Sequence, residues 1–150
     1  MFKRVENNIN LAQVENEISN YWDEIDAFQT SLNNRKNDKI FRFYDGPPFP
    51  TGSPHYGNLL AGVIKDIVPR YWTMRGYYVE RRFGWDVHGL PIEMEVQKNL
   101  NLEDPQQIDE YGIGKFNEAC RTQVQTNTEN WEKITRKIGR WVDFENDYKT

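Results

Sequence analysis

The residues best suited to chemistry lie in a loop rich in proline and glycine that runs from Pro48 to Asn58. Within this loop, His55, Gly57 and Asn58 form the spacing His-x-Gly-Asn, next to the start of a helical pattern. At a helix start, two side chains three residues apart lie on one side and can donate hydrogen bonds to a common spot. Gly57 leaves the backbone bare, so that a ligand can approach it closely.

The position of the loop indicates which ligand this would be. It follows a short β-type run, Ile40 to Tyr44, and precedes a helix. At such a junction of an open α/β sheet, free backbone N–H groups and the helix dipole favour an anion such as phosphate. The fitting chemistry is in-line displacement at phosphorus, in which the protein positions the groups and stabilises spreading negative charge. The four-residue pattern alone fits a plain helix start with a surface histidine equally well.

Apolar spacing predicts the elements that position this loop. One amphipathic helix is expected before it, with an apolar face from Leu11 to Phe28, followed by a polar loop at residues 33–39. A second helical face runs from Leu60 to Tyr71, with Pro69 inside it and Gly76 at its end.

The later part of the chain continues the alternation of strands and helices. The elements expected there are a strand at Tyr77 to Phe83 closed by Gly84-Trp85-Asp86, a helix at Ile92 to Asn99, a loop around Asp104-Pro105 and a long helix from about Gly114 to Gly139. Such an order is typical of an α/β domain with a parallel sheet, yet only two strands are clear where a doubly wound sheet has about five or six. We therefore predict the N-terminal half of a doubly wound parallel sheet, with residues 1–39 as a helical segment and 40–150 as the nucleotide-binding part.

Composition excludes several other classes of protein. The net charge of −4 argues against a surface that binds nucleic acid by charge alone. One cysteine, Cys120, allows no intrachain disulfide, and together with two histidines it is too few for a zinc cage, so no metal site is expected. The chain has neither the apolar run of a signal peptide nor the roughly 20 apolar residues of a membrane span, which predicts a cytoplasmic protein without a membrane partner.

The motif and its surroundings resemble a known family. His55-Tyr56-Gly57-Asn58 resembles the HIGH signature of class I aminoacyl-tRNA synthetases, with Tyr56 and Asn58 departing from the standard letters; asparagine at the last position also occurs in tryptophanyl enzymes. Other blocks are similar to isoleucyl-tRNA synthetases in particular, rather than to the leucyl or valyl enzymes. These blocks are Tyr44-Asp45-Gly46-Pro47-Pro48, Ile64-Lys65-Asp66-Ile67, Arg70-Tyr71, Arg82 to Glu93 and Trp141-Val142-Asp143-Phe144-Glu145.

The resemblance, which covers nearly the whole chain, implies an activity and a set of roles. It implies a Rossmann-type fold and ATP-dependent activation of L-isoleucine to isoleucyl-adenylate, followed by transfer to isoleucine tRNA, with Mg²⁺ accompanying ATP. His55, Gly57 and Asn58 would contact ATP, with His55 and Asn58 as the catalytic pair. Backbone groups around Gly46 and Pro47 would flank the isoleucine, and Asp86 would pair with its α-ammonium.

Other residues of these blocks, and Cys120, have plainer interpretations. Asp86 could instead cap the next helix, and His88 could either contact a ligand or orient the loop. Trp85 is expected in the core or a pocket wall, and Cys120 in the core. Lys65 and Asp66 are expected on a solvated helix face.

The same family resemblance indicates parts that these 150 residues lack. No KMSKS-type lysine loop, editing domain or anticodon-binding helices are found, so we expect the N-terminal piece of a longer enzyme that is inactive alone and contacts tRNA elsewhere. Two alternatives stay open. One is a different nucleotidyltransferase with a His-x-Gly-His motif, and the other is a non-catalytic piece that binds a partner.

Overall fold

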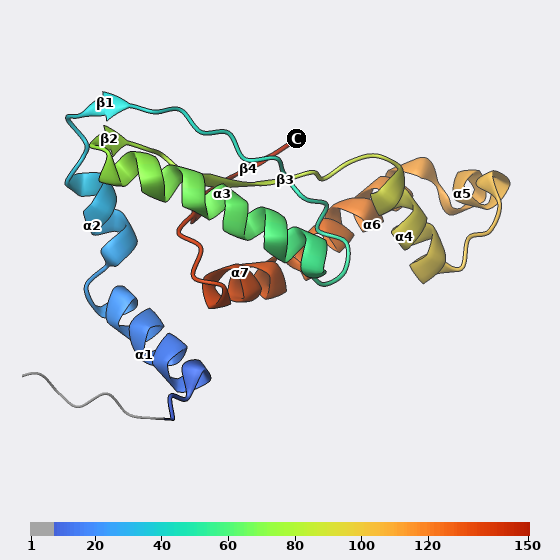
Figure 1. The fold of residues 1–150 in the computed structure, drawn as a ribbon. Coiled ribbons are helices and arrows are strands. Elements are labelled where there is room, and N and C mark those ends of the chain that lie inside the picture. The colour runs from blue at the N-terminus through green and yellow to red at the C-terminus, as the bar shows by residue number, and fades with distance from the viewer. Residues whose placement is uncertain (1–7) are drawn as a thin grey trace, which may run out of the picture.

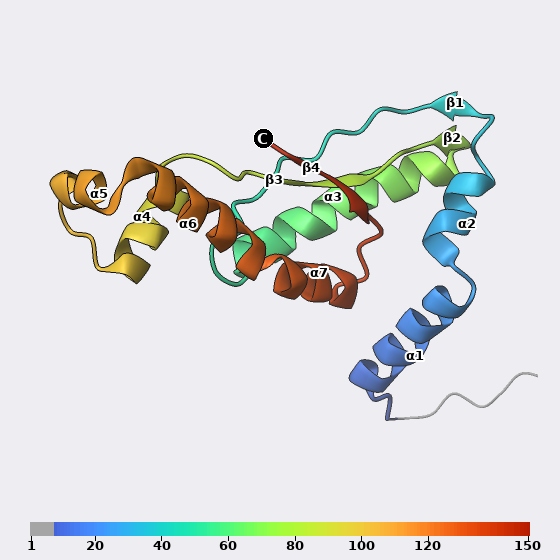
Figure 2. The ribbon, with the colours of Figure 1, turned by 180° about the vertical axis from the view of Figure 1, so that it is seen from behind.

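Helices and short parallel strands make up the chain (Figure 1). The computed structural model describes residues 8–150, apart from the side chains of 125 and 126. In chain order the elements are α1 Leu11–Glu24, α2 Ala27–Asn33, β1 Lys39–Ile40, α3 Tyr56–Met74, β2 Tyr77–Tyr78, β3 Arg82–Trp85, α4 Leu90–Leu100, α5 Pro105–Tyr111, α6 Ile113–Thr126, α7 Thr128–Lys137 and β4 Asp143–Lys149. Seen from both sides, α3 runs along the strands, with α1 and α2 at one end and α4 to α6 at the other (Figures 1 and 2).

The strands form two parallel pairs, β1 with β2 and β3 with β4. The expected parallel pairing is therefore present, but between short strands in two separate pairs. The prediction of one strand from Tyr77 to Phe83 is wrong, because residues 79–81 belong to no strand, and Gly84 and Trp85 belong to β3 instead of closing it. Strand β4 was not predicted. Its sequence, DFENDYK, is mostly polar, and its pairing partner β3 lies about sixty residues earlier in the chain.

The predicted N-terminal helix is divided in two. Asp26 has a φ of 46°, a left-handed conformation that interrupts the helix between α1 and α2. The expected apolar face of α1 stays largely uncovered, with Leu11 69% and Ile18 44% exposed, whereas Trp22 is half-buried. The first seven residues of the expected segment 1–39 lie outside the described residues, and the boundary at residue 39 stays a prediction.

The C-terminal helical region also differs from the single long helix expected. It divides at Asn127 into α6 and α7, and α5 precedes them where a loop was expected. Asp104 caps α5 by accepting from the backbone N–H of Gln106 at 2.9 Å, and Pro105 occupies its first turn. Helix α4 is confirmed and is slightly longer than predicted.

An aromatic core lies between the β3–β4 pair and α7. Phe83 stacks on Phe144 with ring centroids 4.4 Å apart, and Trp85 meets the edge of Trp131 at 6.1 Å. Trp85 is 1% exposed, so the expectation that it is a core residue is confirmed. This core fixes β3, and with it the residues that directly follow β3, relative to α7.

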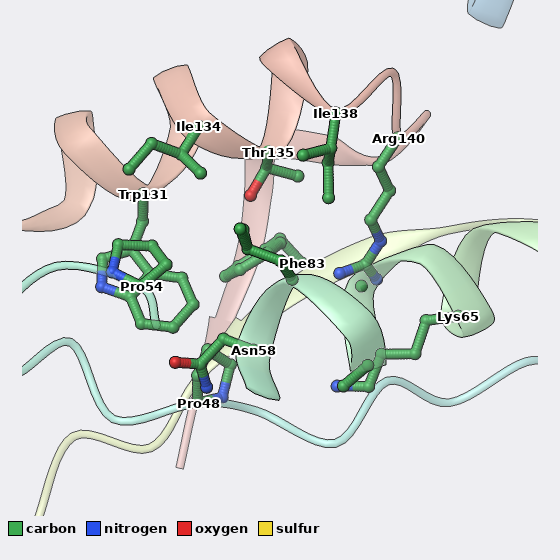
Figure 3. Close-up of a pocket in the computed structure, with 13 residues that line it drawn as sticks. Pro48, Pro54, Asn58, Lys65, Phe83, Trp131, Ile134, Thr135, Ile138 and Arg140 are labelled. Carbon is green, nitrogen blue, oxygen red and sulfur yellow. The ribbon is translucent and has the colours of Figure 1, made fainter. Parts of the chain in front are cut away.

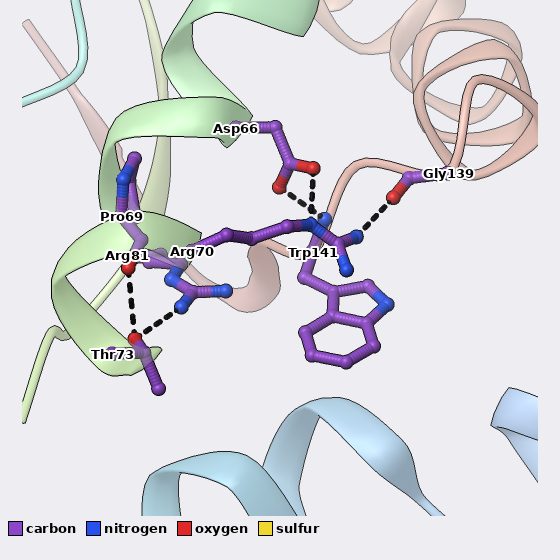
Figure 4. A network of polar contacts seen from close by, with 7 residues as sticks. All are labelled: Asp66, Pro69, Arg70, Thr73, Arg81, Gly139 and Trp141. Carbon is purple, nitrogen blue, oxygen red and sulfur yellow. Dashed lines mark hydrogen bonds and ion pairs between the residues drawn. The ribbon is translucent and has the colours of Figure 1, made fainter. Parts of the chain in front are cut away.

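Arg70 ties α3 to the segment between α7 and β4 (Figure 4). Its Nε donates to Asp66 Oδ2 at 2.5 Å, its Nη2 donates to the carbonyl of Gly139 at 2.5 Å, and its guanidinium lies 3.9 Å from the ring centroid of Trp141. Asp66 also accepts from the backbone N–H of Trp141 at 3.0 Å. The expectation of a solvated Asp66 is wrong, because this carboxylate is a fixed part of the tertiary structure.

The same C-terminal end of α3 is also held by a buried arginine, Arg81 (Figure 4). Arg81 donates from Nη2 to Thr73 Oγ1 at 2.6 Å, and burial lowers its pKa to about 10. Thr73 in turn donates to the carbonyl of Pro69 at 2.8 Å. Helix α3 continues from Tyr56 to Met74 in spite of Pro69. Within the described residues, no helix is long and apolar enough to cross a membrane.

Candidate active site

The start of α3 is built by two side chains that cap it reciprocally. His55 is the N-cap residue, and its Nδ1 accepts from the backbone N–H of Gly57 at 3.1 Å. Asn58 Oδ1 accepts from the backbone N–H of His55 at 3.0 Å. The two bonds form a capping box, which satisfies backbone donors that the first helical turn leaves free.

This capping decides what the two side chains can still offer a ligand. Because His55 Nδ1 accepts a hydrogen bond, the proton of a neutral imidazole is on Nε2. Because Asn58 uses its oxygen, its amide N–H groups are the free end. Neither donor has a partner among the described residues, and both lie at the positive end of a helix of 19 residues. The sequence therefore identified two donors at a helix start, and their contact with ATP stays a prediction.

Gly57 has a local reason to lack a side chain. A Cβ placed there would lie 2.9 Å from His55 Cε1, closer than real Cβ contacts come. With Gly57 in place, the imidazole turns back onto the helix start without this close contact. This packing role accompanies the predicted one, in which the bare backbone admits a ligand.

Helix α7 holds the loop that leads into α3. Trp131 Nε1 donates to the carbonyl of Gly52 at 3.0 Å, and Asn127 Nδ2 donates to the carbonyl of Pro50 at 3.2 Å. Asn130 Nδ2 donates to Ser53 Oγ at 3.0 Å. These anchoring residues were not identified from the sequence. The only sequence signal for this anchoring was that two asparagines lie beside a tryptophan predicted to face inward.

A pocket separates α7 from the first turns of α3 (Figure 3). Its lining includes Pro54 and Asn58 from the start of α3 and the loop before it, Trp131 and Ile134 from α7, and Phe83 from β3. Its volume of about 50 Å³ is far below the roughly 300–1,000 Å³ of a pocket for a ligand of drug size. A nucleotide at the capped helix start would therefore lie outside this pocket.

The loop from Asp45 to Pro48 is held against α3 by ionic contacts. Lys65 Nζ lies 2.6 Å from Asp45 Oδ1 and donates to the carbonyl of Gly46 at 2.6 Å. Arg140 pairs with the other oxygen of Asp45. Tyr148 donates from its hydroxyl to the carbonyl of Asp45 at 2.5 Å, and burial together with the Asp45 charge raises the pKa of this tyrosine, which keeps its proton. The expectation of a solvated Lys65 is wrong, because the buried carboxylate of Asp45 attracts it.

Asp86 lies beside the same loop, directly after β3. Its backbone N–H donates to the carbonyl of Pro48 at 2.9 Å, and its Oδ1 accepts from Thr150 Oγ1 at 2.9 Å. The alternative that Asp86 caps the next helix is wrong, because the N-cap of α4 is Gly89 and no side chain caps it. Asp86 Oδ2 has no hydrogen-bond partner in the described part of the chain.

The expected site residues thus form two groups joined by the loop at residues 48–54. His55, Gly57 and Asn58 form the first group, and Asp86 with the loop of Gly46 and Pro47 forms the second.

Two further residues stand apart from these groups. His88 is exposed, and no contact of its side chain is found among the described residues. Cys120 is a free thiol that is half-buried, at the margin of the core where it was expected. Burial raises its pKa, so the thiol stays protonated. In residues 8–150 no three histidine, cysteine or carboxylate side chains group into a metal site.

Comparison of the sequence with known proteins identifies the family of this chain. The family described as tRNA synthetases class I (I, L, M and V) matches residues 17–150, and the chain belongs to it. The curated relatives that it matches include isoleucine–tRNA ligases: it is 49% identical to that of Treponema denticola over 150 residues and 54% identical to that of Chlamydia abortus over 140 residues. These matches cover 100% and 93% of the chain but 14% and 13% of the relatives, so the chain spans about one seventh of their length.

A solved structure supports the fold. The crystal structure of the ternary complex of Agrobacterium radiobacter K84 agnB2 LeuRS-tRNA-LeuAMS matches with a TM-score of 0.61 at 22% identity, covering 91% of this chain and 15% of that one. The sequence matches to isoleucine–tRNA ligases confirm the resemblance to isoleucyl-tRNA synthetases found in the sequence. The alternative of a nucleotidyltransferase from another family is wrong.

Proposed function

We propose that this chain is the ATP-binding N-terminal part of the catalytic domain of an isoleucine–tRNA ligase. The longer enzyme would form isoleucyl-adenylate from L-isoleucine and MgATP, and would then transfer isoleucine to its tRNA. The observation that carries the proposal is the capping box of α3. It leaves His55 Nε2 and the Asn58 amide as outward donors, beside the loop on which Asp86 lies.

The activation step needs donors that favour the transition state. The isoleucine carboxylate oxygen attacks the α-phosphorus of ATP, the bond to the β-phosphate oxygen breaks, and pyrophosphate leaves with its negative charge. His55 Nε2–H and the Asn58 amide would donate to phosphate oxygens as charge spreads over them, assisted by the dipole of α3. Donors for the opposite side of the phosphates would come from segments beyond these 150 residues.

The amino acid would lie next to the second group of residues. The Asp86 carboxylate matches the α-ammonium of isoleucine in charge, and its Oδ2 is available in the described structure. Backbone around Gly46 and Pro47 would flank the substrate, in a loop held in place by Lys65 and Arg140.

The remaining assignments follow from the same proposal. The short parallel strands would belong to a Rossmann-type sheet that segments of the longer protein complete, and Mg²⁺ would arrive with ATP as substrate. Isoleucine tRNA would bind mainly outside this acidic chain, which by itself should form no isoleucyl-tRNA. A cytoplasmic location is proposed because tRNA charging serves translation there.

The test uses two substitutions of His55 in the full-length protein. Asparagine is a good N-cap residue, so His55→Asn preserves the start of α3, and with its oxygen in the cap its shorter amide does not reach the position of the Nε2 donor. His55→Ala removes both the N-cap acceptor and the Nε2 donor. We expect each variant to form adenylate about 100- to 1000-fold more slowly than the wild type. His55→Asn with the rate of the wild type would show that His55 serves only as a cap, and would overturn the assigned mechanism.

A further inference from the structure

Asp45 carries a carboxylate that is almost fully buried, with a side chain 2% exposed. Two cations from different parts of the chain face it: Lys65 from α3, with Nζ 2.6 Å from Oδ1, and Arg140 from the segment after α7, on Oδ2. A buried carboxylate is tolerated only with such partners, because its charge has lost the stabilisation of water. The ion triad therefore fixes Asp45 at the point where the loop begins.

Lys65 does more than neutralise this charge. Its Nζ also donates to the carbonyl of Gly46 at 2.6 Å, so the ammonium binds the side chain of one loop residue and the backbone of the next. Lys65 belongs to α3, the same helix whose first turn is capped by His55 and Asn58. One side chain thus joins the helix proposed to bind ATP to the loop proposed to flank isoleucine.

Other residues hold the loop from Asp45 to Pro48 by hydrogen bonds to its backbone. Tyr148 donates to the carbonyl of Asp45, and the backbone N–H of Asp86 donates to the carbonyl of Pro48 at 2.9 Å. These bonds connect the loop to β4 and to the end of β3. Among the described residues, only Lys65 connects it to α3 by a hydrogen bond or an ion pair. Figure 3 shows Lys65 and Arg140 on the same side of the pocket, away from Trp131.

We infer that Lys65 is a positioning residue of the activation reaction, which holds the Gly46 carbonyl and thereby sets the isoleucine-binding loop relative to the ATP-binding helix. The inference rests on the proposed function. Lys65 would touch neither substrate. Its loss should therefore impair the use of isoleucine, through movement of Gly46 and Pro47, while the capped start of α3 and its use of ATP stay nearly intact.

The test is isoleucine-dependent pyrophosphate exchange by the full-length protein with Lys65→Met, Lys65→Arg and Lys115→Met. Methionine keeps the length of the side chain but removes the charge and the donor, so KM for isoleucine should rise about tenfold while KM for ATP changes less than about twofold. Arginine retains the charge and can donate to both Asp45 and Gly46, and should recover most of the loss. Lys115 is exposed on α6, and Lys115→Met controls for the loss of one positive charge.

The exchange assay separates failure of the proposed function from failure of the inference about Lys65. If the wild type shows no exchange with isoleucine, the proposed function fails and the inference fails with it. If the wild type is active and Lys65→Met has an unchanged KM for isoleucine, or raises both KM values equally, the inference alone is overturned. Should Lys65→Met fail to fold, Lys65→Gln takes its place, since its amide cannot neutralise Asp45 and should give the same selective rise in KM.

Discussion

The backbone N–H of Asp86 donates to the carbonyl of Pro48 across 2.9 Å, which joins the end of β3 to the loop after β1. Two stretches that are separate in the sequence, Asp45 to Pro48 and the Gly-Trp-Asp block, therefore form one structural unit. Thr150 completes it on the side of β4 by donating to the Asp86 carboxylate. This unit is the surface on which we propose that isoleucine binds.

Asp86→Asn should weaken the binding of isoleucine selectively. Asparagine can still accept from Thr150 and leaves the backbone bond to Pro48 intact, so the fold should be unchanged. It lacks the charge that would pair with an α-ammonium, and KM for isoleucine should rise roughly ten- to a hundredfold, with KM for ATP nearly constant. Steady-state exchange kinetics of the full-length enzyme measure both. An unchanged dependence on isoleucine would remove Asp86 from the binding site.

Substitutions of Asn58 should separate helix capping from ATP binding. In Asn58→Asp a carboxylate oxygen can still accept from the backbone N–H of His55, so thermal stability should not fall. The new negative charge would face the phosphates of ATP, and KM for ATP should rise strongly. Asn58→His, which can donate from its ring, should retain most of the activity. Equal activity of the two variants would mean that Asn58 does not contact ATP.

Gly84→Ala should loosen the pairing of β3 with β4. The ring of Tyr148 lies directly over Gly84, and an added Cβ would overlap it. Overpacking of this kind costs about 1–3 kcal/mol, so amides of β3 and β4 should exchange hydrogen roughly five- to a hundredfold faster in the full-length protein. Gly114→Ala in α6 is the control, because a Cβ there meets nothing within 4 Å. Equal exchange in both variants would show that Tyr148 can move aside at little cost.

The isolated 150-residue chain should self-associate through α3. Leu60, Ile64 and Ile67 lie on one side of this helix and are 64%, 54% and 59% exposed. Contiguous exposed apolar surface favours association. Replacing Ile64 and Ile67 with lysine should shift sedimentation velocity profiles towards the monomer. Replacing the equally exposed Ile113 of α6 should have little effect, and a monomeric wild type would contradict the prediction.

Local sequence signals predicted the elements near the site well. The loop between Asp45 and Gly57, the start of α3 beside His55 and the helix after Asp86 all follow from proline, glycine and apolar spacing. Helix α5 also has a local signal, because Asp104-Pro105 with Gln107 forms a capping box, although the same aspartate and proline predict a loop in the sequence.

The parts that could not be predicted depend on contacts between distant residues. Strand β4 is mostly polar and owes its geometry to pairing with β3. Lys65 and Asp66 looked solvated because their partners, Asp45 and Trp141, come from other segments. The break at Asp26 has no strong local signal, since only its left-handed conformation marks it.

Pyrophosphate exchange by the full-length protein, measured with isoleucine, valine, leucine and methionine as alternative substrates, tests the central claim most directly. The proposed function predicts that isoleucine gives the highest kcat/KM, and that the exchange rate falls about 100- to 1000-fold in His55→Asn although the helix cap is kept. Exchange that responds better to another of these amino acids, or that persists at the wild-type rate in His55→Asn, would contradict it.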